Sequence, residues 1–437
     1  MMKEIYQVPT SQSLQGDVII SGAKNAVLPL MAATLLCRGI SIINNVPQLD
    51  DVNTMAEVLR YLGAKVEHQN SSLTIDTREC DGYQAPYHLV TKMRASIYVL
   101  GPLLARLGQA SVALPGGCAW GPRPVDLHIA GMQALSAKVE LSHGNIHAHA
   151  GRLQGADFTF SISSVGATVN LLLASVLADG TTRLFNAAIE PEIDNLVDQL
   201  NAMGAQIFGK GTSTLVIEGV TELKAATIDA IPDRIEAGTY LIAGAITQGK
   251  VTVKQVQPAH LTALIDSLTA TGTLICCEDD SITIDAQQRA LQPISIKTGP
   301  YPLFATDLQP QWMALCVSLT GVSQVTDTIY PDRFQHVAEL CRLGANIRVK
   351  GNTACIIGTP NLSGAPVKAS DLRAGAALIL AGLIASDYTE ISDIHHLDRG
   401  YQNLIGKFAT LGATIKRSHH PVATNQAIAA PLLSLCG

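Results

Sequence analysis

Leu62-Gly-Ala-Lys-Val66 is the first of six related segments along this chain. The other five are Leu135-Ser-Ala-Lys-Val, Met203-Gly-Ala-Gln-Ile, Thr271-Gly-Thr-Leu-Ile, Leu343-Gly-Ala-Asn-Ile and Leu411-Gly-Ala-Thr-Ile, and the segments start 73, 68, 68, 72 and 68 residues apart. A second marker keeps the same spacing, because small apolar helices are predicted to end near Gly39, Gly108, Gly180, Gly249 and Gly321, with Asp387 in the sixth copy. Two sequence features that recur with the same spacing indicate a repeated supersecondary unit.

Each unit predicts the same order of elements. A short strand, such as residues 17–21, leads into an alanine- and leucine-rich helix, which a second strand follows. An amphipathic helix then ends at the Leu-Gly-Ala segment, and a β-hairpin returns the chain. The first helix of each unit is apolar all round, as in residues 374–385, so we expect it to be buried. Units of about 70 residues exceed solenoid repeats of about 20–50, which favours closed α/β domains of three units each.

Composition excludes several classes of protein. The 437 residues are 47% hydrophobic and 15% charged, with a net charge of −6, so we expect two or three folded domains and no nucleic-acid partner. Nine scattered cysteines without a C-x-x-C pair are typical of reduced thiols. The chain shows no signal region, and its longest uncharged apolar run, residues 374–386, is too short to cross a bilayer. We therefore expect a cytoplasmic protein with no membrane partner.

The six strand-to-helix junctions are the most informative positions. They read Ser21-Gly-Ala-Lys24-Asn25, Lys92-Met-Arg94, Ser163-Ser164-Val165-Gly166, Asp233-Arg234, Thr306-Asp307 and Asp371-Leu-Arg373. Helix N-termini favour anions, and a lysine or arginine at four of these junctions adds positive charge. The alternative is that the Ser, Thr and Asp residues are N-caps and that the cations are solvated or paired. Both interpretations stay open at this point.

Three further features suggest chemistry. Cys118 lies in a glycine- and proline-rich loop, five residues before Arg123, where a nearby cation would favour the thiolate. Asp307 is either a helix cap or a general base. Arg399 follows two adjacent histidines, and because no metal-ligand spacing is present we interpret it as an anion ligand. The chain has neither a Walker loop nor a G-x-G-x-x-G motif.

Collinear motifs from about residue 5 to residue 416 resemble the UDP-N-acetylglucosamine 1-carboxyvinyltransferases of the enolpyruvyl transferase family. They are Ser21-Gly-Ala-Lys-Asn-Ala, Met93-Arg-Ala-Ser, Leu114-Pro-Gly-Gly-Cys, Arg123-Pro-Val-Asp-Leu-His, Pro232-Asp-Arg-Ile-Glu, Thr306-Asp-Leu-Gln, Asp371-Leu-Arg and Asp398-Arg-Gly-Tyr. The resemblance implies a two-domain inside-out α/β barrel of six repeats, three per domain, with a double-stranded hinge where the chain crosses near residues 22 and 231. The implied domains are residues 24–231, with the mobile Cys118 loop, and residues 1–23 plus 232–416, followed by a flexible tail at 417–437.

The same resemblance implies a reaction. The enolpyruvyl group of phosphoenolpyruvate is transferred to the 3-hydroxyl of UDP-N-acetylglucosamine by addition and elimination, and phosphate is released. This is the first committed step of peptidoglycan synthesis, and it implies no cofactor and no metal.

Roles follow residue by residue from the resemblance. Cys118 would be the proton donor, able to form a covalent adduct with phosphoenolpyruvate, and Asp307 would take the hydroxyl proton. The phosphate and carboxylate of phosphoenolpyruvate would be held by Lys24, Arg123 and Arg399, with Asn25 beside Lys24. Arg373 would be a further substrate-binding residue. The residues implied to line the nucleotide-sugar site are Arg94, Pro124, Val125, Asp126, Leu127, Ser164, Val165, Gly166 and Ile329.

Three departures from the family pattern concern the acceptor. Ile162 stands where a lysine is usual, Trp120 stands where a small or aliphatic residue is usual, and Arg373-Ala-Gly-Ala replaces Arg-Ala-Ser-Ala. Two alternatives are therefore a diverged paralogue with another acceptor and a catalytically silent nucleotide-sugar sensor. The presence of Lys24, Cys118, Asp307 and Arg399 together favours an enzyme. The Cys118 loop favours this family over the shikimate-phosphate enolpyruvyl transferases, which share its fold.

Overall fold

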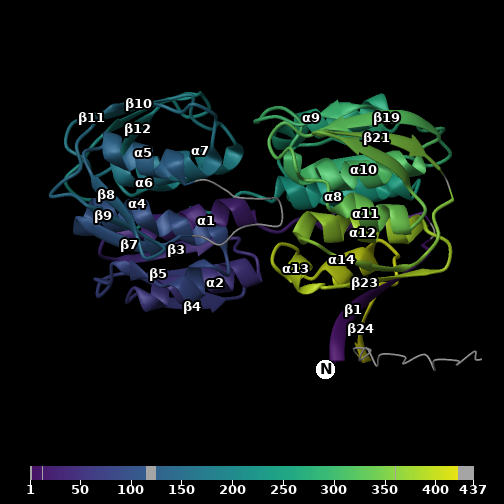
Figure 1. Cartoon of the computed structure of the whole chain (residues 1–437), viewed down its shortest axis with the longest axis horizontal. Coiled ribbons are helices and arrows are strands. Elements are labelled where there is room, and N and C mark those ends of the chain that lie inside the picture. The colour runs from purple at the N-terminus through teal and green to yellow at the C-terminus, as the bar shows by residue number, and fades with distance from the viewer. Residues whose placement is uncertain (1, 12, 115–124, 360, 422–437) are drawn as a thin grey trace, which may run out of the picture.

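The computed structural model describes residues 2–11, 13–114, 125–359 and 361–421, which form two lobes (Figure 1). One lobe has a hydrophobic cluster drawn from residues 27–230, and the other has a second cluster drawn from residues 6–20 and 235–415. We call residues 24–231 the first half and residues 2–23 with 232–421 the second half. The first half is continuous in sequence, whereas the second half is built from both ends of the chain.

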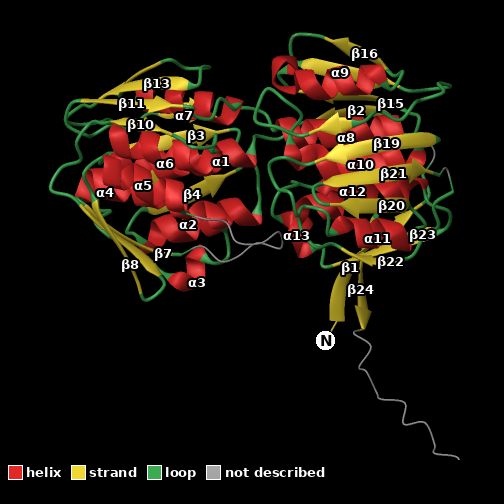
Figure 2. Ribbon diagram, turned by 45° about the horizontal axis from the view of Figure 1, so that its top comes forward, coloured by secondary structure: helices red, strands yellow, loops and turns green. Residues whose placement is uncertain are grey.

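Buried helices lie inside each half, and the sheets lie outside them (Figure 2). Because these helices have no continuous polar face, they need cover on every side. The buried helices are α1 (Lys24–Ala33), α4 (Leu100–Leu107), α6 (Val165–Ser175), α8 (Arg234–Ile246), α10 (Gln309–Ser318) and α12 (Leu372–Ile384).

A second, amphipathic helix follows in each repeat and ends at the Leu-Gly-Ala segment. These helices are α2 (Asp50–Tyr61), α5 (Asp126–Ala134), α7 (Pro191–Ala202), α9 (Thr262–Ala270), α11 (His336–Arg342) and α14 (Leu404–Thr410). The short helices are α3 (Tyr87–Val90), α13 (His395–Asp398) and the 3₁₀ turns η1 (Thr34–Leu36), η2 (Arg94–Val99), η3 (Pro258–Leu261) and η4 (Thr306–Leu308).

The second residue of the Leu-Gly-Ala segment has a left-handed backbone in every repeat. In five repeats it is a glycine, with φ between 92° and 105°. In the second repeat it is Ser136, with φ 69°. Only glycine adopts this conformation without a steric cost, so the repeat explains the five glycines.

The strands of the described residues form six four-stranded sheets with one shared topology. In each sheet, the first strand is parallel to the second, the second is antiparallel to the third, and the third is antiparallel to the fourth. In the first half the sheets are β14 (Thr227–Asp229), β3 (Ile40–Asn44), β5 (Ser72–Asp76), β4 (Lys65–Gln69); β6 (Gln84–Ala85), β7 (Gln109–Ala113), β9 (Asn145–His149), β8 (Lys138–Ser142); and β10 (Asp157–Thr159), β11 (Thr181–Phe185), β13 (Thr214–Glu218), β12 (Gln206–Phe208). In the second half they are β2 (Gln15–Ile19), β15 (Lys250–Lys254), β17 (Ser281–Asp285), β16 (Leu274–Cys277); β18 (Ile296–Lys297), β19 (Gly321–Thr326), β21 (Thr353–Gly358), β20 (Asn346–Lys350); and β22 (Pro366–Lys368), β23 (Tyr388–Ser392), β1 (Met2–Pro9), β24 (Lys416–Pro421).

The chain crosses between the halves twice at one place. Strand β2 pairs with β15 of the second half, and β14 pairs with β3 of the first half. Between them Gly22 forms an antiparallel bridge with Pro232, and the amide of Ala23 donates to the carbonyl of Ile231 at 2.7 Å. This confirms the predicted two-part α/β architecture with a double-stranded hinge.

The C-terminal strand differs from the expectation of a tail starting at residue 417. Residues 416–421 form β24 and pair with β1, from Gln7 opposite Lys416 to Met2 opposite Pro421. The physical reason is the repeat itself, because every Leu-Gly-Ala segment is followed by a hairpin. In the sixth repeat β24 supplies the first hairpin strand, and the N-terminal β1 supplies the second.

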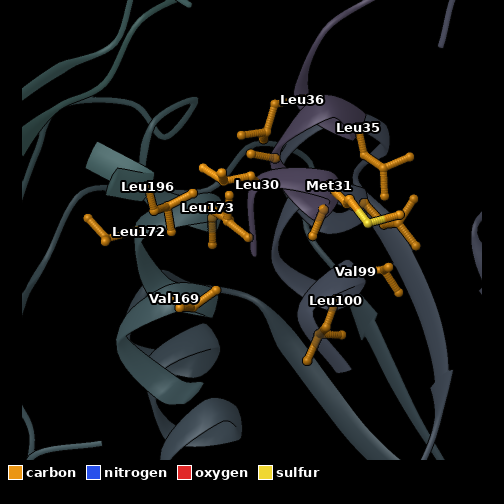
Figure 3. Close-up of a cluster of buried hydrophobic side chains, with 14 of the residues drawn as sticks. Leu30, Met31, Leu35, Leu36, Val99, Leu100, Val169, Leu172, Leu173 and Leu196 are labelled. Atoms are coloured by element: carbon orange, nitrogen blue, oxygen red, sulfur yellow. The ribbon is translucent and has the colours of Figure 1, made fainter. Parts of the chain in front are cut away.

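The core holds the helix starts in place. Figure 3 shows Leu30 and Met31 of α1 in one cluster with Leu100 of α4 and Leu173 of α6. All four residues are fully buried. Burying such a side chain contributes about 1.5–3 kcal/mol. A densely packed interior of this kind fixes where the polar helix starts emerge.

No helix within the described residues combines the length and the apolar character needed to span a bilayer.

Candidate functional site

Three of the six predicted junctions are capped helix starts. Ser164 Oγ accepts from the amide of Ala167 at 3.4 Å and caps α6. Asp233 caps α8 and Asp371 caps α12, each by accepting two amide hydrogen bonds. The N-cap interpretation is therefore confirmed for these three residues, whose side chains satisfy helix amides instead of leaving them for a ligand.

Two other junctions begin with a 3₁₀ turn where we expected an α-helix. Arg94 opens η2 before α4, and Asp307 lies in η4 before α10. Pro102 and Pro310 stand in the first turns of α4 and α10, where a missing N–H costs nothing, so the regular helix begins there.

Lys24 and Arg399 meet at one buried carboxylate. Lys24 is the first residue of α1, and its Nζ lies 3.3 Å from Oδ2 of Asp51 at the start of α2. Arg399, directly after α13, donates from Nε to Oδ1 of the same carboxylate at 2.8 Å. The contact joins the two halves, since Lys24 and Asp51 belong to the first half and Arg399 to the second.

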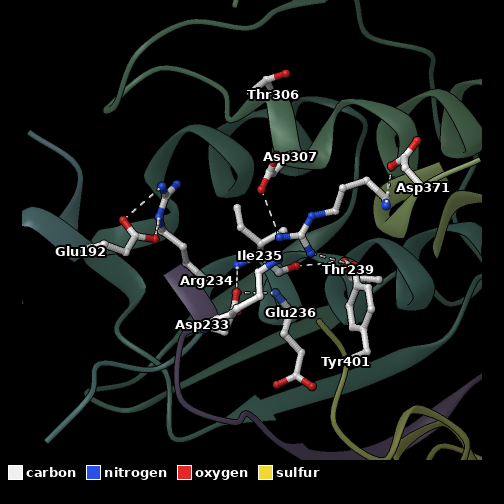
Figure 4. A network of polar contacts seen from close by, with 12 residues as sticks. Glu192, Asp233, Arg234, Ile235, Glu236, Thr239, Thr306, Asp307, Asp371 and Tyr401 are labelled. Carbon is white, nitrogen blue, oxygen red and sulfur yellow. Dashed lines mark hydrogen bonds and ion pairs between the residues drawn. The ribbon is translucent and has the colours of Figure 1, made fainter. Parts of the chain in front are cut away.

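Asp307 lies between two arginines of the second half. Its Oδ1 accepts from Nη1 of Arg333 at 2.8 Å, and its Oδ2 accepts from Nη2 of Arg373 at 3.0 Å. The two arginine side chains are 2% and 4% exposed, whereas the Asp307 side chain is 28% exposed. Figure 4 shows Asp307 above Tyr401, whose hydroxyl accepts from Nη1 of Arg373 at 3.3 Å.

The charges around Asp307 determine its protonation. Burial alone would raise its pKa, but Arg373 and Arg333 outweigh burial and, with Lys24, hold the pKa of this carboxyl well below its usual range. Asp307 is therefore ionised at any physiological pH in this arrangement. Lys24 therefore pairs with Asp51 and also lowers the pKa of Asp307 electrostatically.

A turn anchored by the buried Asp327 positions Ile329. Oδ1 of Asp327 accepts from the amides of Ile329 and Tyr330 at 3.0 and 2.8 Å. Its Oδ2 accepts from the hydroxyl of Thr306, which lies beside Asp307. The same aspartate thus orders the segment after β19 and the start of η4.

A second group of predicted residues gathers around His128 in the first half. His128 is 4% exposed, and its Nδ1 lies 2.8 Å from the side-chain Nδ2 of Asn170 on α6. Burial, aided by the nearby Arg94 cation, lowers the pKa of His128 to about 4, so its imidazole is neutral at pH 7. A Cβ added at Gly166 would lie 3.5 Å from the His128 ring, which places the start of α6 against it.

The remaining predicted residues are distributed as follows. Asp126 is exposed at the start of α5, whereas Asn25, Val125, Leu127, Ser164 and Val165 are half-buried at or near the starts of α1, α5 and α6. Cys118, Arg123 and Pro124 lie outside the described residues. The predicted set therefore falls into a charged group around Asp51 and Asp307 and a largely neutral group around His128.

Asp51 and Arg333 were missed by the sequence analysis. Asp51 stands in the acidic first turn of α2, where carboxylates ordinarily favour the helix dipole, so it gave no distinct signal. Arg333 lies in a loop between β19 and α11, and its partner is 26 residues away. Among the described residues, no group of three or more His, Cys, Asp or Glu side chains is arranged to hold a metal ion.

Comparison with known proteins gives consistent matches. A family model described as EPSP synthase (3-phosphoshikimate 1-carboxyvinyltransferase) matches residues 8–408. The UDP-N-acetylglucosamine 1-carboxyvinyltransferase of Desulfosudis oleivorans is 50% identical over 410 residues, covering 94% of this chain and 98% of that protein. That of Chlorobaculum parvum is 51% identical over 412 residues, covering 94% and 97%.

Two solved structures share the architecture. The enolpyruvyl transferase NikO from Streptomyces tendae superposes with a TM-score of 0.87 at 25% identity, covering 96% of this chain and all of NikO. EPSP synthase from Acinetobacter baumannii superposes with a TM-score of 0.72 at 18% identity, covering 95% and 100%, and shows the same fold.

Proposed function

Because this chain belongs to the enolpyruvyl transferase family, we propose that it transfers the enolpyruvyl group of phosphoenolpyruvate to the 3-hydroxyl of UDP-N-acetylglucosamine and releases phosphate. Relatives about 50% identical over nearly their whole length carry that activity in their names, which favours this acceptor over that of a diverged paralogue. The reaction would be the first committed step of peptidoglycan synthesis, in the cytoplasm.

The observation that carries the proposal is a set of four cations, two at the boundary between the halves and two beside Asp307 in the second half. Lys24 and Arg399 meet at the boundary, and Arg333 and Arg373 flank Asp307. Phosphoenolpyruvate and UDP-N-acetylglucosamine are both anions, so their binding side by side needs several positive charges. Lys24, Arg399 and Arg123 would hold phosphoenolpyruvate, with Asn25 beside Lys24.

The chemistry would follow two balanced steps. The 3-hydroxyl oxygen bonds to C2 of phosphoenolpyruvate while Asp307 accepts the hydroxyl proton and Cys118 gives a proton to C3. The C2–O bond to phosphate then breaks and C3 gives a proton back to the Cys118 thiolate, which yields the enol ether and phosphate. The role of Cys118, which lies outside the described residues, rests on the family resemblance alone.

The low pKa of Asp307 is relevant to its role as a base. A carboxylate stabilised by Arg373 and Arg333 accepts a proton weakly in the ligand-free protein. The negative charges of phosphoenolpyruvate would offset those cations once it binds, and the pKa of Asp307 would rise towards the range in which it takes a proton. Base strength would then appear only with both substrates in place.

The nucleotide sugar would occupy the first half near the starts of η2, α5 and α6. The residues assigned to it are Arg94, Pro124, Val125, Asp126, Leu127, Ser164, Val165 and Gly166, with Ile329 and Asp307 facing it from the second half. We also propose that residues 24–231 and residues 1–23 with 232–416 act as two domains that close on the substrates.

Phosphate release from phosphoenolpyruvate by the purified protein tests the proposal. Release that depends on UDP-N-acetylglucosamine, with none in the presence of 3-phosphoshikimate, is the expected result. A protein that releases no phosphate although both ligands raise its melting temperature would be a sensor. Release that needs a different acceptor would identify the diverged paralogue.

A further inference from the structure

Asp51 is the one ion-pair partner, among the described residues, of both Lys24 and Arg399. It is 3% exposed, and each of its carboxylate oxygens serves a different cation. A carboxylate buried this deeply destabilises the folded protein unless nearby positive charges compensate its own charge. Its direct ion pairs set one negative charge against two positive ones.

The geometry leaves donors for a further anion. Asp51 binds Arg399 through Nε alone, so neither Nη group of this guanidinium donates to the carboxylate, and both keep their N–H donors. An ammonium group has three donors, and Asp51 takes one from Lys24. The Arg399 side chain is 37% exposed, which leaves it accessible from the solvent side.

The same carboxylate sets the spacing across the boundary between the halves. Lys24 and Asp51 lie on helices of the first half, and Arg399 belongs to the second half. A hydrogen bond from backbone to side chain lies on the same boundary, where the amide of Gln48 donates to Oε1 of Gln402 at 3.1 Å. Without Asp51, no described group would hold Arg399 beside Lys24.

We propose that Asp51 is a positioning residue for phosphoenolpyruvate: it holds the Lys24 ammonium and the Arg399 guanidinium side by side, so that both bind one phosphate group. Asp51 itself touches neither substrate. This inference rests on the proposed function.

A second ion pair across the boundary provides a matched control. Glu192 at the start of α7 accepts from Nε and Nη2 of Arg234 at 3.0 and 3.3 Å, and the two side chains are 5% and 12% exposed (Figure 4). This pair joins the same two halves and is similarly buried, but it contacts neither Lys24 nor Arg399. Loss of a boundary ion pair can thus be separated from loss of cation positioning.

The experiment compares steady-state kinetics of Asp51→Asn, Asp51→Glu and Glu192→Gln with those of the wild type. For Asp51→Asn we expect the KM for phosphoenolpyruvate to rise about tenfold or more, while the KM for UDP-N-acetylglucosamine changes by less than about threefold. Asp51→Glu keeps the charge and should recover part of the loss, and Glu192→Gln should leave the phosphoenolpyruvate KM within about threefold of wild type. An unchanged or lowered phosphoenolpyruvate KM in Asp51→Asn, or an equal rise in Glu192→Gln, would overturn the inference.

Ligand-induced shifts in melting temperature keep this test separate from that of the proposed function. A wild-type protein that releases no phosphate would refute the function. The Asp51 inference would still be supported if phosphoenolpyruvate or inorganic phosphate raised the melting temperature of the wild type but not of Asp51→Asn. Equal shifts in both proteins would refute it. If Asp51→Asn does not fold, Asp51→Glu decides by the same two criteria.

Discussion

The two halves of the molecule have the same sheet topology but present different groups at their helix starts. In the second half, Asp307 and Arg373 stand at the starts of the fifth and sixth repeats and pair in a buried, fully ionic cluster with Arg333. In the first half, Ser164 caps its own helix and His128 is held neutral by burial. The repeat therefore determines where helix starts emerge, whereas a few side chains determine what each half can bind.

The difference between the halves follows from what compensates each buried group. The arginines of the second half are stable because a carboxylate lies between them, and removing it would leave two buried charges. The neutral imidazole of the first half needs no counter-charge and is satisfied by Asn170. We expect substitutions in the ionic half to affect both activity and stability, and those in the neutral half to affect mainly the pH dependence of stability.

Asp307→Asn should have the largest effect. Phosphate release should fall by about 10²- to 10⁴-fold, the usual contribution of a general base. The urea midpoint should fall as well, since breaking a buried ion pair costs about 3–5 kcal/mol. Both quantities are measured on the same preparation.

Asp285→Asn is the control for Asp307→Asn. Its side chain is also 28% exposed, but it pairs at 3.4 Å with Lys250, which is 55% exposed. An ion pair on the surface contributes about 0–1 kcal/mol, so this variant should retain activity and most of its stability. Equal losses in the two variants would contradict the assignment of Asp307 to an ionic cluster.

His128→Asn should change how stability depends on pH. The folded pKa of His128 is lowered to about 4, below that of about 6.5 in an unfolded chain, so the unfolded state binds the proton first as the pH falls. Wild-type stability should decline between pH 6.5 and pH 4, with roughly 3 kcal/mol attributable to this residue. The variant lacks the imidazole, so its urea midpoint should decline less over this window.

A second buried histidine, His336 in the second half, must be separated from His128 in this measurement. Burial lowers its pKa to about 4 as well, so it contributes a similar decline in both proteins and remains as a background. The comparison of urea midpoints at pH 7.5 and pH 4.5 isolates the His128 contribution. Parallel declines in wild type and His128→Asn would show that the first half does not depend on a neutral imidazole.

Ser136→Gly should have the smallest effect, and it should be stabilising. Ser136 adopts the left-handed conformation that glycine takes in the other five repeats. Relief of that strain, less the entropy that glycine loses on folding, should raise stability by about 0.5–1 kcal/mol. The reverse change is Gly204→Ser. A Cβ at Gly204 would have no atom within 4 Å, so a fall in the thermal midpoint of this variant would report backbone strain alone. A lower midpoint for Ser136→Gly would contradict the argument.

Much of the fold could be predicted because the repeat acts locally. The Leu-Gly-Ala segments predicted where the amphipathic helices end, and the crossing near residues 22 and 231 was placed from the resemblance. The role of residues 417–421 was missed because their partner, β1, is at the opposite end of the chain. Pairing over such a separation leaves no local pattern in the sequence.

The candidate site was predictable only in part, for the same reason. Lys24, Asp307, Arg373 and Arg399 stand at helix starts or in motifs, so their positions could be read directly. Asp51 acquires its significance from Arg399, 348 residues later, and that contact appears only once the halves are assembled. Charge compensation inside a fold depends on neighbours in space, which a single sequence does not reveal.

The double crossing at Gly22 and Pro232 has a consequence for synthesis on the ribosome. The described strands of the first half pair only with one another, so this half can fold once β14 has emerged, while the rest of the chain is still being translated. Strands β1 and β2 are made first, yet their partners β15, β23 and β24 are made much later. Strands β1 and β2 therefore stay unpaired while the first half folds. The sheet that contains β1 is complete only when β24, the last strand of the described chain, has been translated.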